Sequence, residues 1–422
     1  METGRDLGPT ESGDGAFPSL RTPHGAATLR RVTLRSFRWV VLVWLGLFRT
    51  SAADPASAHP TSELRTELDR IRRSRGVPAL TAGLVRSNVV MDVATVGVRK
   101  AGIELPAGPD DLWHLGSLTK SMTATAAAVL VGEGRLRWDS TVGEVLEASV
   151  PGMHADWKPV TVAQLLRHHG GAPDHGWLGK LGLWETLWNH PGTPRQQREH
   201  WIGFVLTRPP AFKPGAKPVY SNTGYVLVGS MIEAVTGEAW EEWIRSRVFR
   251  PMGLSSAGFG VPARPRFIDQ PWGHRWEGAT PTPVPPGPDA DNPSGLGPAG
   301  TVHMSLGDLL RYGAFHAAEG RPGLGPVGLD LARPILRELH EAPAGGTDAF
   351  GWKVLRRDWG GGDVLTHNGS NNQWFAVLWI APARATAVAA VTNIGDDDRH
   401  TASLAADDAV AWLIRRHLQR PE

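Results

Sequence analysis

Strand-like runs lie near both ends of this 422-residue chain, and helix-like runs lie between them. Residues 80–85 and 89–98 are rich in β-branched side chains and flank a short polar turn, which is typical of an antiparallel hairpin. The simplest way to bury strands at both ends is to join them in one sheet. We therefore expect an α+β fold with an antiparallel sheet flanked by helices. The strand-like runs of the carboxyl end are residues 352–355, 364–366, 374–380 and 386–392.

Helical periodicity accounts for most of the remaining chain. Residues 61–75 and 402–417 each place apolar side chains on one helical face, so we expect these terminal helices to cover the sheet. Several helical segments fall within residues 137–300, and we expect a mostly helical region inserted between the N- and C-terminal halves of the sheet. Within that region, the proline-rich residues 281–298 are expected to lack regular structure.

The residues at the amino end lack the pattern expected of a folded domain. Basic residues precede an apolar run at residues 39–48, and small residues follow it, with cleavage expected after about Ala53 or Ala58. The run is shorter than the roughly 20 residues that cross a bilayer. We therefore expect residues 1–53 to be a signal peptide and leader. Residues 54–422 would form one secreted or periplasmic domain with no membrane span after cleavage. The alternative is that the apolar run forms a buried strand or short helix.

Charge gives no indication of a nucleic-acid or membrane-surface partner. The whole chain has 44 basic and 42 acidic residues. Residues 1–53 contain seven of the basic and four of the acidic residues, so the remainder has 37 basic and 38 acidic residues and a net charge of −1. A neutral mature protein lacks the field that attracts polyanions. The absence of cysteine excludes disulfides and thiolate metal sites.

A serine and a lysine three residues apart begin a predicted buried helix. Ser117 and Lys120 would lie on the same helical face, with Cβ atoms about 5–6 Å apart. A lysine amine at this distance can remove the proton of a serine hydroxyl and make it a nucleophile. The pattern alone is weak, but Ser117 and Lys120 form its only occurrence in this chain. The apolar stripe that defines the helix is Leu118, Met122, Ala126 and Leu130.

A second motif combines a tyrosine with an asparagine just before a predicted helix. Tyr220 is one of only three tyrosines, and Asn222 follows it two positions later. An adjacent positive charge favours the anionic form of a phenol, so Tyr220 could serve as general base and later protonate the leaving group. Asn222 offers an amide to the substrate or to Lys120. Taken alone, this motif also fits a buried tyrosine beside a helix-capping asparagine.

A third motif lies at the edge of a predicted strand. A glycine there lets a ligand approach the backbone closely, so the amides of Ser117 and Ser370 could form an oxyanion hole. His367 would offer a hydrogen bond or partial positive charge to a substrate carboxylate or carbonyl. Taken alone, the motif is typical of a turn. Its residues are Thr366, His367, Asn368, Gly369 and Ser370.

The three motifs, in this order, resemble the serine β-lactamase and penicillin-binding-protein superfamily. The resemblance is to the Tyr-x-Asn branch, which contains class C β-lactamases, D-alanyl-D-alanine carboxypeptidases and related esterases. It runs over roughly residues 62–417. Further phrases typical of the family are residues 164–169, 212–215, 224–225, 251–254 and 299–300.

The resemblance implies a mixed sheet-and-helix fold and an acyl-enzyme mechanism that uses no metal or cofactor. It makes Ser117 the nucleophile and Lys120 and Tyr220 the proton-handling pair. Asn222 and residues 367–370 would contact the substrate, a small ester, amide or peptide. No oligomeric state is indicated.

The chain departs from true β-lactamases at the first position of the third motif, where histidine replaces lysine. Lysine is permanently charged, whereas histidine near its usual pKa is mostly neutral. His367 therefore favours substrates that lack the carboxylate of a β-lactam.

Three alternative functions fit the sequence less well. A zinc site could involve His168, His169 and His175, but His168 and His169 are adjacent and no His-Glu-x-x-His motif occurs. An α/β-hydrolase is disfavoured because Gly-x-Ser-x-Gly is absent. The main alternative is a catalytically silent, penicillin-binding-protein-like module that binds peptidoglycan or a partner. The presence of Ser117, Lys120, Tyr220 and Asn222 disfavours it, because a pure binding module does not need all four.

Overall fold

The computed structural model describes residues 62–174, 176, 179, 190–326 and 328–419. The chain divides into residues 1–52 and 53–422, and every described residue belongs to the second unit. The predicted signal segment and its cleavage sites lie outside the described residues. Within the described part, no helix has the length and apolar character needed to cross a membrane.

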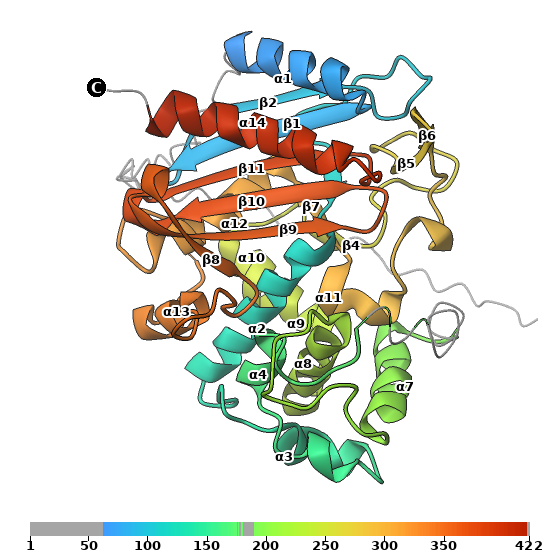
Figure 1. Cartoon of the computed structure of the whole chain (residues 1–422), viewed down its shortest axis with the longest axis vertical. Coiled ribbons are helices and arrows are strands. Elements are labelled where there is room, and N and C mark those ends of the chain that lie inside the picture. Colours follow the sequence, from blue (N-terminus) through green and yellow to red (C-terminus); the bar gives the residue numbers. More distant parts are fainter. Residues whose placement is uncertain (1–61, 175, 177–178, 180–189, 327, 420–422) are drawn as a thin grey trace, which may run out of the picture. The chain divides into compact units, whose positions relative to one another are not determined.

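A six-stranded antiparallel sheet unites the two ends of the chain, as expected (Figure 1). The N-terminal hairpin joins the C-terminal strands through β1 and β11, which pair from Leu80 opposite Thr392 to Arg86 opposite Thr386. The strand order is β2-β1-β11-β10-β9-β8. The strands are β1 (Ala79–Arg86), β2 (Val89–Gly97), β8 (Lys353–Arg357), β9 (Gly362–Ser370), β10 (Phe375–Ala381) and β11 (Thr386–Thr392).

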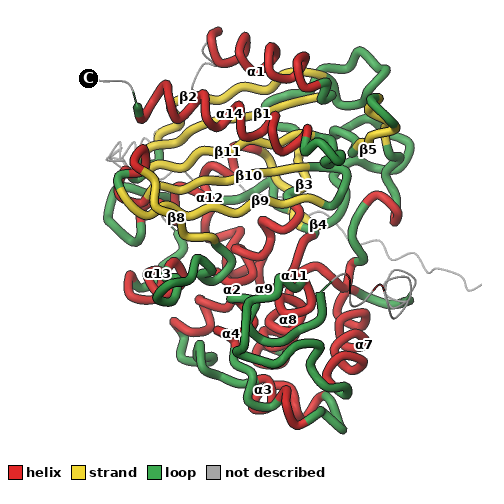
Figure 2. Tube along the Cα trace, in the orientation of Figure 1, coloured by secondary structure: helices red, strands yellow, loops and turns green. Residues whose placement is uncertain are grey.

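Helices cover both faces of this sheet (Figure 2). The terminal helices α1 (Ser62–Arg75) and α14 (Thr401–Leu418) share an apolar cluster with one face. On the other face, α12 (Leu306–Ala318) packs on β11, β1 and β10. Its Gly313 lies so close that an added methyl group would meet the side chain of Ala387 at 2.7 Å. Both terminal helices and their positions confirm the sequence-based expectation.

The region between the two parts of the sheet is mostly helical. Three of its helices begin at capping boxes, which Thr141, Thr161 and Thr193 each form with the residue three positions later. The helices are α2 (Thr119–Gly132), α3 (Val142–Leu146), α4 (Val162–Leu166), α7 (Pro194–Leu206), α8 (Asn222–Thr236), α9 (Trp240–Ile244), α10 (Arg250–Met252) and α11 (Gly297–Gly300). Helix α13 (Arg333–His340) precedes β8.

One expectation for this region is wrong: the proline-rich residues 281–298 contain regular structure. They include most of β6 (Thr280–Pro283), which pairs with β5 (His274–Glu277), and the first two residues of α11. The two strands form a ribbon of their own, so each has an unpaired edge. Proline is tolerated in an edge strand, where its missing N–H removes no required hydrogen bond.

A small sheet leads the chain into the central helix. Strand β3 (Leu112–His114) pairs with β7 (Val302–Ser305), which also pairs with β4 (Gly258–Phe259). A single 3-10 turn, Gly116–Leu118, then connects β3 to α2. The strand therefore fixes the position from which Ser117 and α2 begin.

Candidate active site

Ser117 lies in the 3-10 turn that precedes the buried helix α2. Every residue from Thr119 to Leu130 is buried, so this helix is held on all sides. Gly116 has φ +50°, a left-handed conformation that side chains with a Cβ rarely adopt. The turn thus presents Ser117 from a rigid support.

Lys120 is fully buried and points at the predicted nucleophile. Its Nζ donates to Ser117 Oγ at 3.0 Å, to Asn222 Oδ1 at 2.7 Å and to the carbonyl oxygen of Ala299 at 2.7 Å. The amide oxygen and the carbonyl can only accept hydrogen bonds. Each of them therefore accepts one hydrogen of Lys120 Nζ, and the third bonding direction of Nζ faces Ser117.

Burial lowers the pKa of Lys120, because an isolated ammonium is poorly solvated inside the protein. The nearby Tyr220 partly opposes this effect. A neutral amine keeps its two hydrogens on Asn222 and Ala299 and points its lone pair at Ser117 Oγ. In that state Lys120 can accept the serine proton.

The second motif comes to the same place from the start of α8. Asn222 is the first residue of α8 and contacts Lys120, one of the two roles that the sequence left open. The ring of Tyr220 has its centroid 4.9 Å from Lys120 Nζ and is 49% exposed. Tyr220 can therefore contact the lysine and solvent at once. Ser221 anchors the motif, since its Oγ caps the helix at Gly224 and donates to the carbonyl of Pro173.

His168 orders the second motif, a role that the sequence analysis did not assign. Its ring stacks on Tyr220 with centroids 4.5 Å apart, and its Nδ1 accepts from the amide of Ser221 at 3.1 Å. Burial, followed by the charge of Lys120, holds the pKa of His168 well below its usual value. His168 is thus a neutral support for Tyr220. The family-like phrase at residues 164–169 was the sequence signal.

The third motif, on β9, touches the turn that carries Ser117. A methyl group on Gly369 would overlap the carbonyl of Leu115 and lie 2.5 Å from the amide nitrogen of Ser117. A methyl group on Gly116 would overlap the amide nitrogen of Ser370. Two glycines therefore allow the two backbones to meet. The amides of Ser117 and Ser370 lie on adjoining segments, as an oxyanion hole requires.

The side chains of the third motif differ in their surroundings. His367 is half-buried, and its Nδ1 lies 2.5 Å from the carbonyl oxygen of Asn368. Burial and the charge of Lys120 lower the pKa of His367 to about 4. His367 is therefore neutral at pH 7, with its proton on Nδ1 and an acceptor at Nε2. The side chain of Asn368 is exposed, and Ser370 Oγ accepts from the amide of Asn372.

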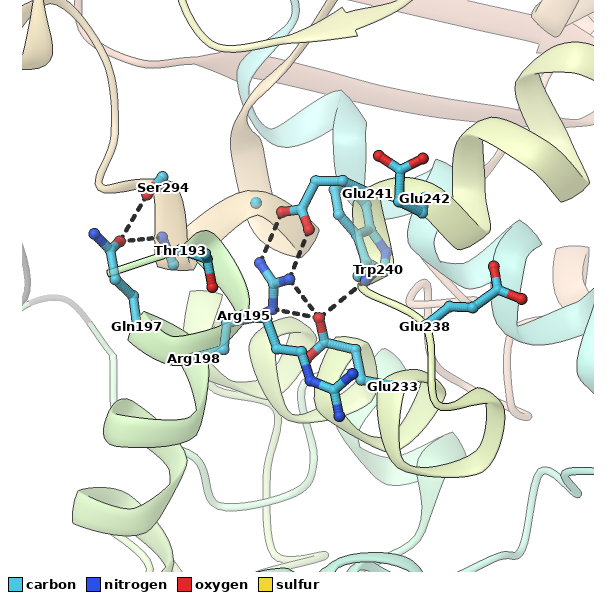
Figure 3. A network of polar contacts seen from close by, with 12 residues as sticks. Thr193, Arg195, Gln197, Arg198, Glu233, Glu238, Trp240, Glu241, Glu242 and Ser294 are labelled. Atoms are coloured by element: carbon cyan, nitrogen blue, oxygen red, sulfur yellow. Dashed lines mark hydrogen bonds and ion pairs between the residues drawn. The ribbon is translucent and has the colours of Figure 1, made fainter. Parts of the chain in front are cut away.

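Helix α7 contacts the chain at Ser294, which leads into α11 (Figure 3). Gln197 Oε1 accepts from Ser294 Oγ and from the amide of Gly295, just before α11. The next residue, Arg198, is completely buried and binds the carboxylates of Glu233 and Glu241. Helix α7 is thereby fixed to α8 and α9 while it holds the chain leading to the carbonyl that binds Lys120. The family-like phrase at residues 299–300 marked this place, but no role was predicted for Ala299, because a main-chain contact does not depend on residue type.

His168, one residue of the zinc alternative, supports Tyr220. The described part of the chain holds no group of three or more His, Cys, Asp or Glu side chains that could bind a metal ion. His175 lies outside the described residues.

A sheet covered on both faces by helices, with a Ser-x-x-Lys turn at the start of the buried central helix, defines the class of serine β-lactamase-like proteins. The chain belongs to the Beta-lactamase family, whose sequence profile matches residues 64–411.

Its relatives include penicillin-binding protein 4 of Amycolatopsis lactamdurans, which is 26% identical over 78% of this chain and 84% of the relative. A lovastatin esterase of Penicillium rubens is 27% identical over 57% of each chain. Among solved structures, the octameric penicillin-binding protein homologue from Pyrococcus abyssi superposes with a TM-score of 0.66 at 23% identity. That match covers 84% of this chain and 78% of the other. It shows that the fold is shared.

Proposed function

We propose that the protein is a secreted serine hydrolase that cleaves an ester, amide or peptide through an acyl-Ser117 intermediate. One observation carries the proposal. The buried amine of Lys120, with its lowered pKa, lies 3.0 Å from Ser117 Oγ while two pure acceptors hold its other hydrogens.

The proposed reaction has two halves. Ser117 Oγ attacks the substrate carbonyl as its proton passes to Lys120, and the amides of Ser117 and Ser370 stabilise the oxyanion. The pair of Lys120 and Tyr220 then delivers that proton to the leaving alcohol or amine, which departs as the acyl-enzyme forms. Water attacks the acyl-enzyme in the second half, gives its proton to the same pair and releases the acid.

The neutral His367 favours acyl groups without a carboxylate next to the scissile bond. An uncharged imidazole with an acceptor at Nε2 cannot form the charge-assisted hydrogen bond that a lysine would offer to a carboxylate. We therefore expect simple esters and amides to react faster than penicillins. The names of two relatives, a penicillin-binding protein and an esterase, are compatible with either acyl donor.

The test is intact-protein mass after incubation with a fluorophosphonate, a p-nitrophenyl ester, a penicillin and a D-Ala-D-Ala peptide. We expect a fluorophosphonate adduct on the wild type and none on Ser117→Ala. Ser121→Ala serves as matched control, since Ser121 lies in α2 just after the turn that carries Ser117 but donates to the carbonyl of Leu118. An adduct that survives in Ser117→Ala would refute the mechanism. The absence of any adduct or turnover in the wild type would favour the silent binding module.

A further inference from the structure

A single buried carboxylate connects the segments that meet around Ser117. Asp291 lies in the chain just before α11, and its side chain is only 9% exposed. Its Oδ1 is in polar contact with two side chains and one backbone amide, from His114, Asn371 and Asn292. Each of these residues lies in or next to a different chain segment of the candidate active site.

The first connection runs through His114 to the turn that carries Ser117. The amide of Gly116 donates to His114 Nδ1 at 3.1 Å, so the neutral ring holds its proton on Nε2. That Nε2 lies 2.8 Å from Asp291 Oδ1, and the ring is completely buried. The imidazole therefore lies between Asp291 and the peptide that joins Leu115 to Gly116, in close polar contact with the carboxylate on one side and accepting from the amide on the other.

The second connection runs through Asn371 to the end of β9. Asn371 Nδ2 donates to Asp291 Oδ1 at 3.3 Å and to the carbonyl of Ala290 at 3.4 Å. Asn371 directly follows Ser370, whose amide is the other predicted oxyanion donor. One carboxylate oxygen is therefore linked, through His114 and Asn371, to both backbone segments that carry the proposed oxyanion donors.

The third connection reaches the segment that binds Lys120. The amide of Asn292 donates to Asp291 Oδ1 at 2.6 Å, and Asn292 Nδ2 donates to the carbonyl of Gly300 at 2.8 Å. Gly300 follows Ala299, whose carbonyl accepts from Lys120.

We propose that Asp291 is a positioning residue that sets the separation of the Ser117 and Ser370 amides in the oxyanion hole. The proposal rests on the serine-hydrolase function proposed above. Burying a carboxylate is unfavourable unless partners compensate it. Among the described residues, no lysine or arginine pairs with Asp291, and its one contact with an ionisable nitrogen is with the His114 ring, which is neutral in this arrangement. Its remaining partners are the two amide donors, so its contacts serve placement and not charge neutralisation by a strong cation.

The test compares an ester with the matching thionoester, in which sulfur replaces the carbonyl oxygen. Sulfur is larger and accepts hydrogen bonds poorly, so an ordered oxyanion hole prefers the oxygen ester. Asp291→Ala should lower kcat/KM for the oxygen ester about a hundredfold, as a displacement of about 1 Å or a lost oxyanion donor does. It should lower the thionoester rate much less, so the oxygen-to-sulfur rate ratio should collapse.

Two further variants make the result specific. Asp291→Asn keeps one oxygen that can accept from His114, Asn292 and Asn371, so it should recover much of the ratio and remains testable if Asp291→Ala does not fold. Asp308→Ala is the matched control, because Asp308 is 8% exposed and accepts from Ser256 far from the motifs in sequence. It should destabilise the protein without changing the ratio.

The outcomes separate this inference from the proposed function. A wild type that turns over the ester through Ser117, with an unchanged oxygen-to-sulfur ratio in both Asp291 variants, would overturn only the positioning role. Equal losses for both esters would also overturn it, because a merely structural defect lowers both rates alike. A wild type with no Ser117-dependent turnover would overturn the inference and the function together.

Discussion

At the scale of single residues, the protonation state of Lys120 controls the proposed chemistry. Only the neutral amine can accept the proton of Ser117, and burial lowers the pKa of Lys120 below 10.5. We therefore predict that kcat/KM for a p-nitrophenyl ester rises with pH and reaches half its maximum below pH 10.5. A pH series of initial rates measures this. Lys120→Arg should lack the rise, since guanidinium does not deprotonate. A rate that falls as pH increases would contradict the role of Lys120 as base.

His367 gives a second prediction, which concerns substrate choice. His367→Lys would place a charged donor where the wild type has a neutral ring. A hydrogen bond to a charged group contributes about 1.5–3 kcal/mol, so the variant should favour a penicillin over a neutral ester by about tenfold or more relative to wild type. The measurement is the ratio of kcat/KM values for the two substrates. His367→Gln keeps a neutral polar side chain and should leave this ratio nearly unchanged. No gain for the penicillin in His367→Lys would show that this position does not select against carboxylates.

At the scale of elements, the contact between β9 and the turn before α2 depends on the absence of side chains. A methyl group on Gly369 would overlap backbone atoms on both sides of Ser117, and backbone cannot swing aside as a flexible side chain can. We predict that Gly369→Ala lowers kcat/KM by about a hundredfold or more, because it separates the two oxyanion donors. Gly203→Ala is the matched control.

Gly203 lies in α7 with nothing within 4 Å of an added Cβ, so alanine there should stabilise the helix by up to about 1 kcal/mol. Steady-state kinetics and thermal melts of the two variants make the comparison. Full activity in Gly369→Ala would mean that β9 does not need to approach Ser117 so closely.

The buried arginine of α7 links three helices and gives a prediction for stability (Figure 3). Arg198 binds Glu233 at 2.5 Å and Glu241 at 2.7 Å, and Glu233 also accepts from the amide of Trp240. Removing the arginine leaves the buried carboxylate of Glu233 and the partly buried carboxylate of Glu241 without their cation. We therefore predict that Arg198→Ala lowers the free energy of unfolding by about 3–5 kcal/mol.

The control for Arg198 lies on the same helix. Glu199→Ala removes an exposed pair with Arg195 and should cost at most about 1 kcal/mol. Urea denaturation of both variants tests the contrast. Equal effects would show that burial adds nothing to the Arg198 interactions.

These elements also show which parts of the structure the sequence could predict. Helices α1 and α14 were predictable because apolar residues repeat every three to four positions on one face, and α2 was predictable from its regularly spaced apolar residues although the whole helix is buried. Strand β6 was not, because its prolines oppose strand structure locally and only pairing with β5 outweighs them. Local propensity is a weak prior when a tertiary partner is present.

The residues of the candidate site also fall into those that the sequence could predict and those that it could not. Ser117, Lys120, Tyr220 and Asn222 were identified because their chemistry depends on side-chain type and spacing. The carbonyl of Ala299 and the link from Asp291 to His114 were missed, because main-chain contacts and partners 177 positions apart leave no pattern in one sequence.

At the scale of the whole molecule, the order of the strands ties the two ends of the chain into one cooperative unit. Strand β1 lies between β2 and β11, so the N-terminal hairpin gains a neighbouring strand only when the C-terminal strands are in place. Helices α1 and α14 share one apolar cluster over the same face of the sheet. The sheet therefore depends on contacts between distant parts of the sequence, and such topologies fold slowly because long loops must close first. If the chain crosses a membrane before it folds, its N-terminal and C-terminal strands are both present before the sheet has to close.

Export is the last prediction, and it rests on the contrast between residues 1–53 and the described domain. The candidate site and the sheet lie entirely within residues 62–419, whereas the basic and apolar signal pattern precedes them. We predict that a secreting host releases a processed protein that begins near residue 54 or 59 and retains Ser117-dependent esterase activity. Intact mass and N-terminal sequencing of the released protein measure this. Deleting residues 39–48 should keep the protein inside the cell while leaving its activity after purification unchanged, because no residue of the site is removed. An unprocessed chain of 422 residues inside the cell would instead support the alternative that the apolar run is part of the fold.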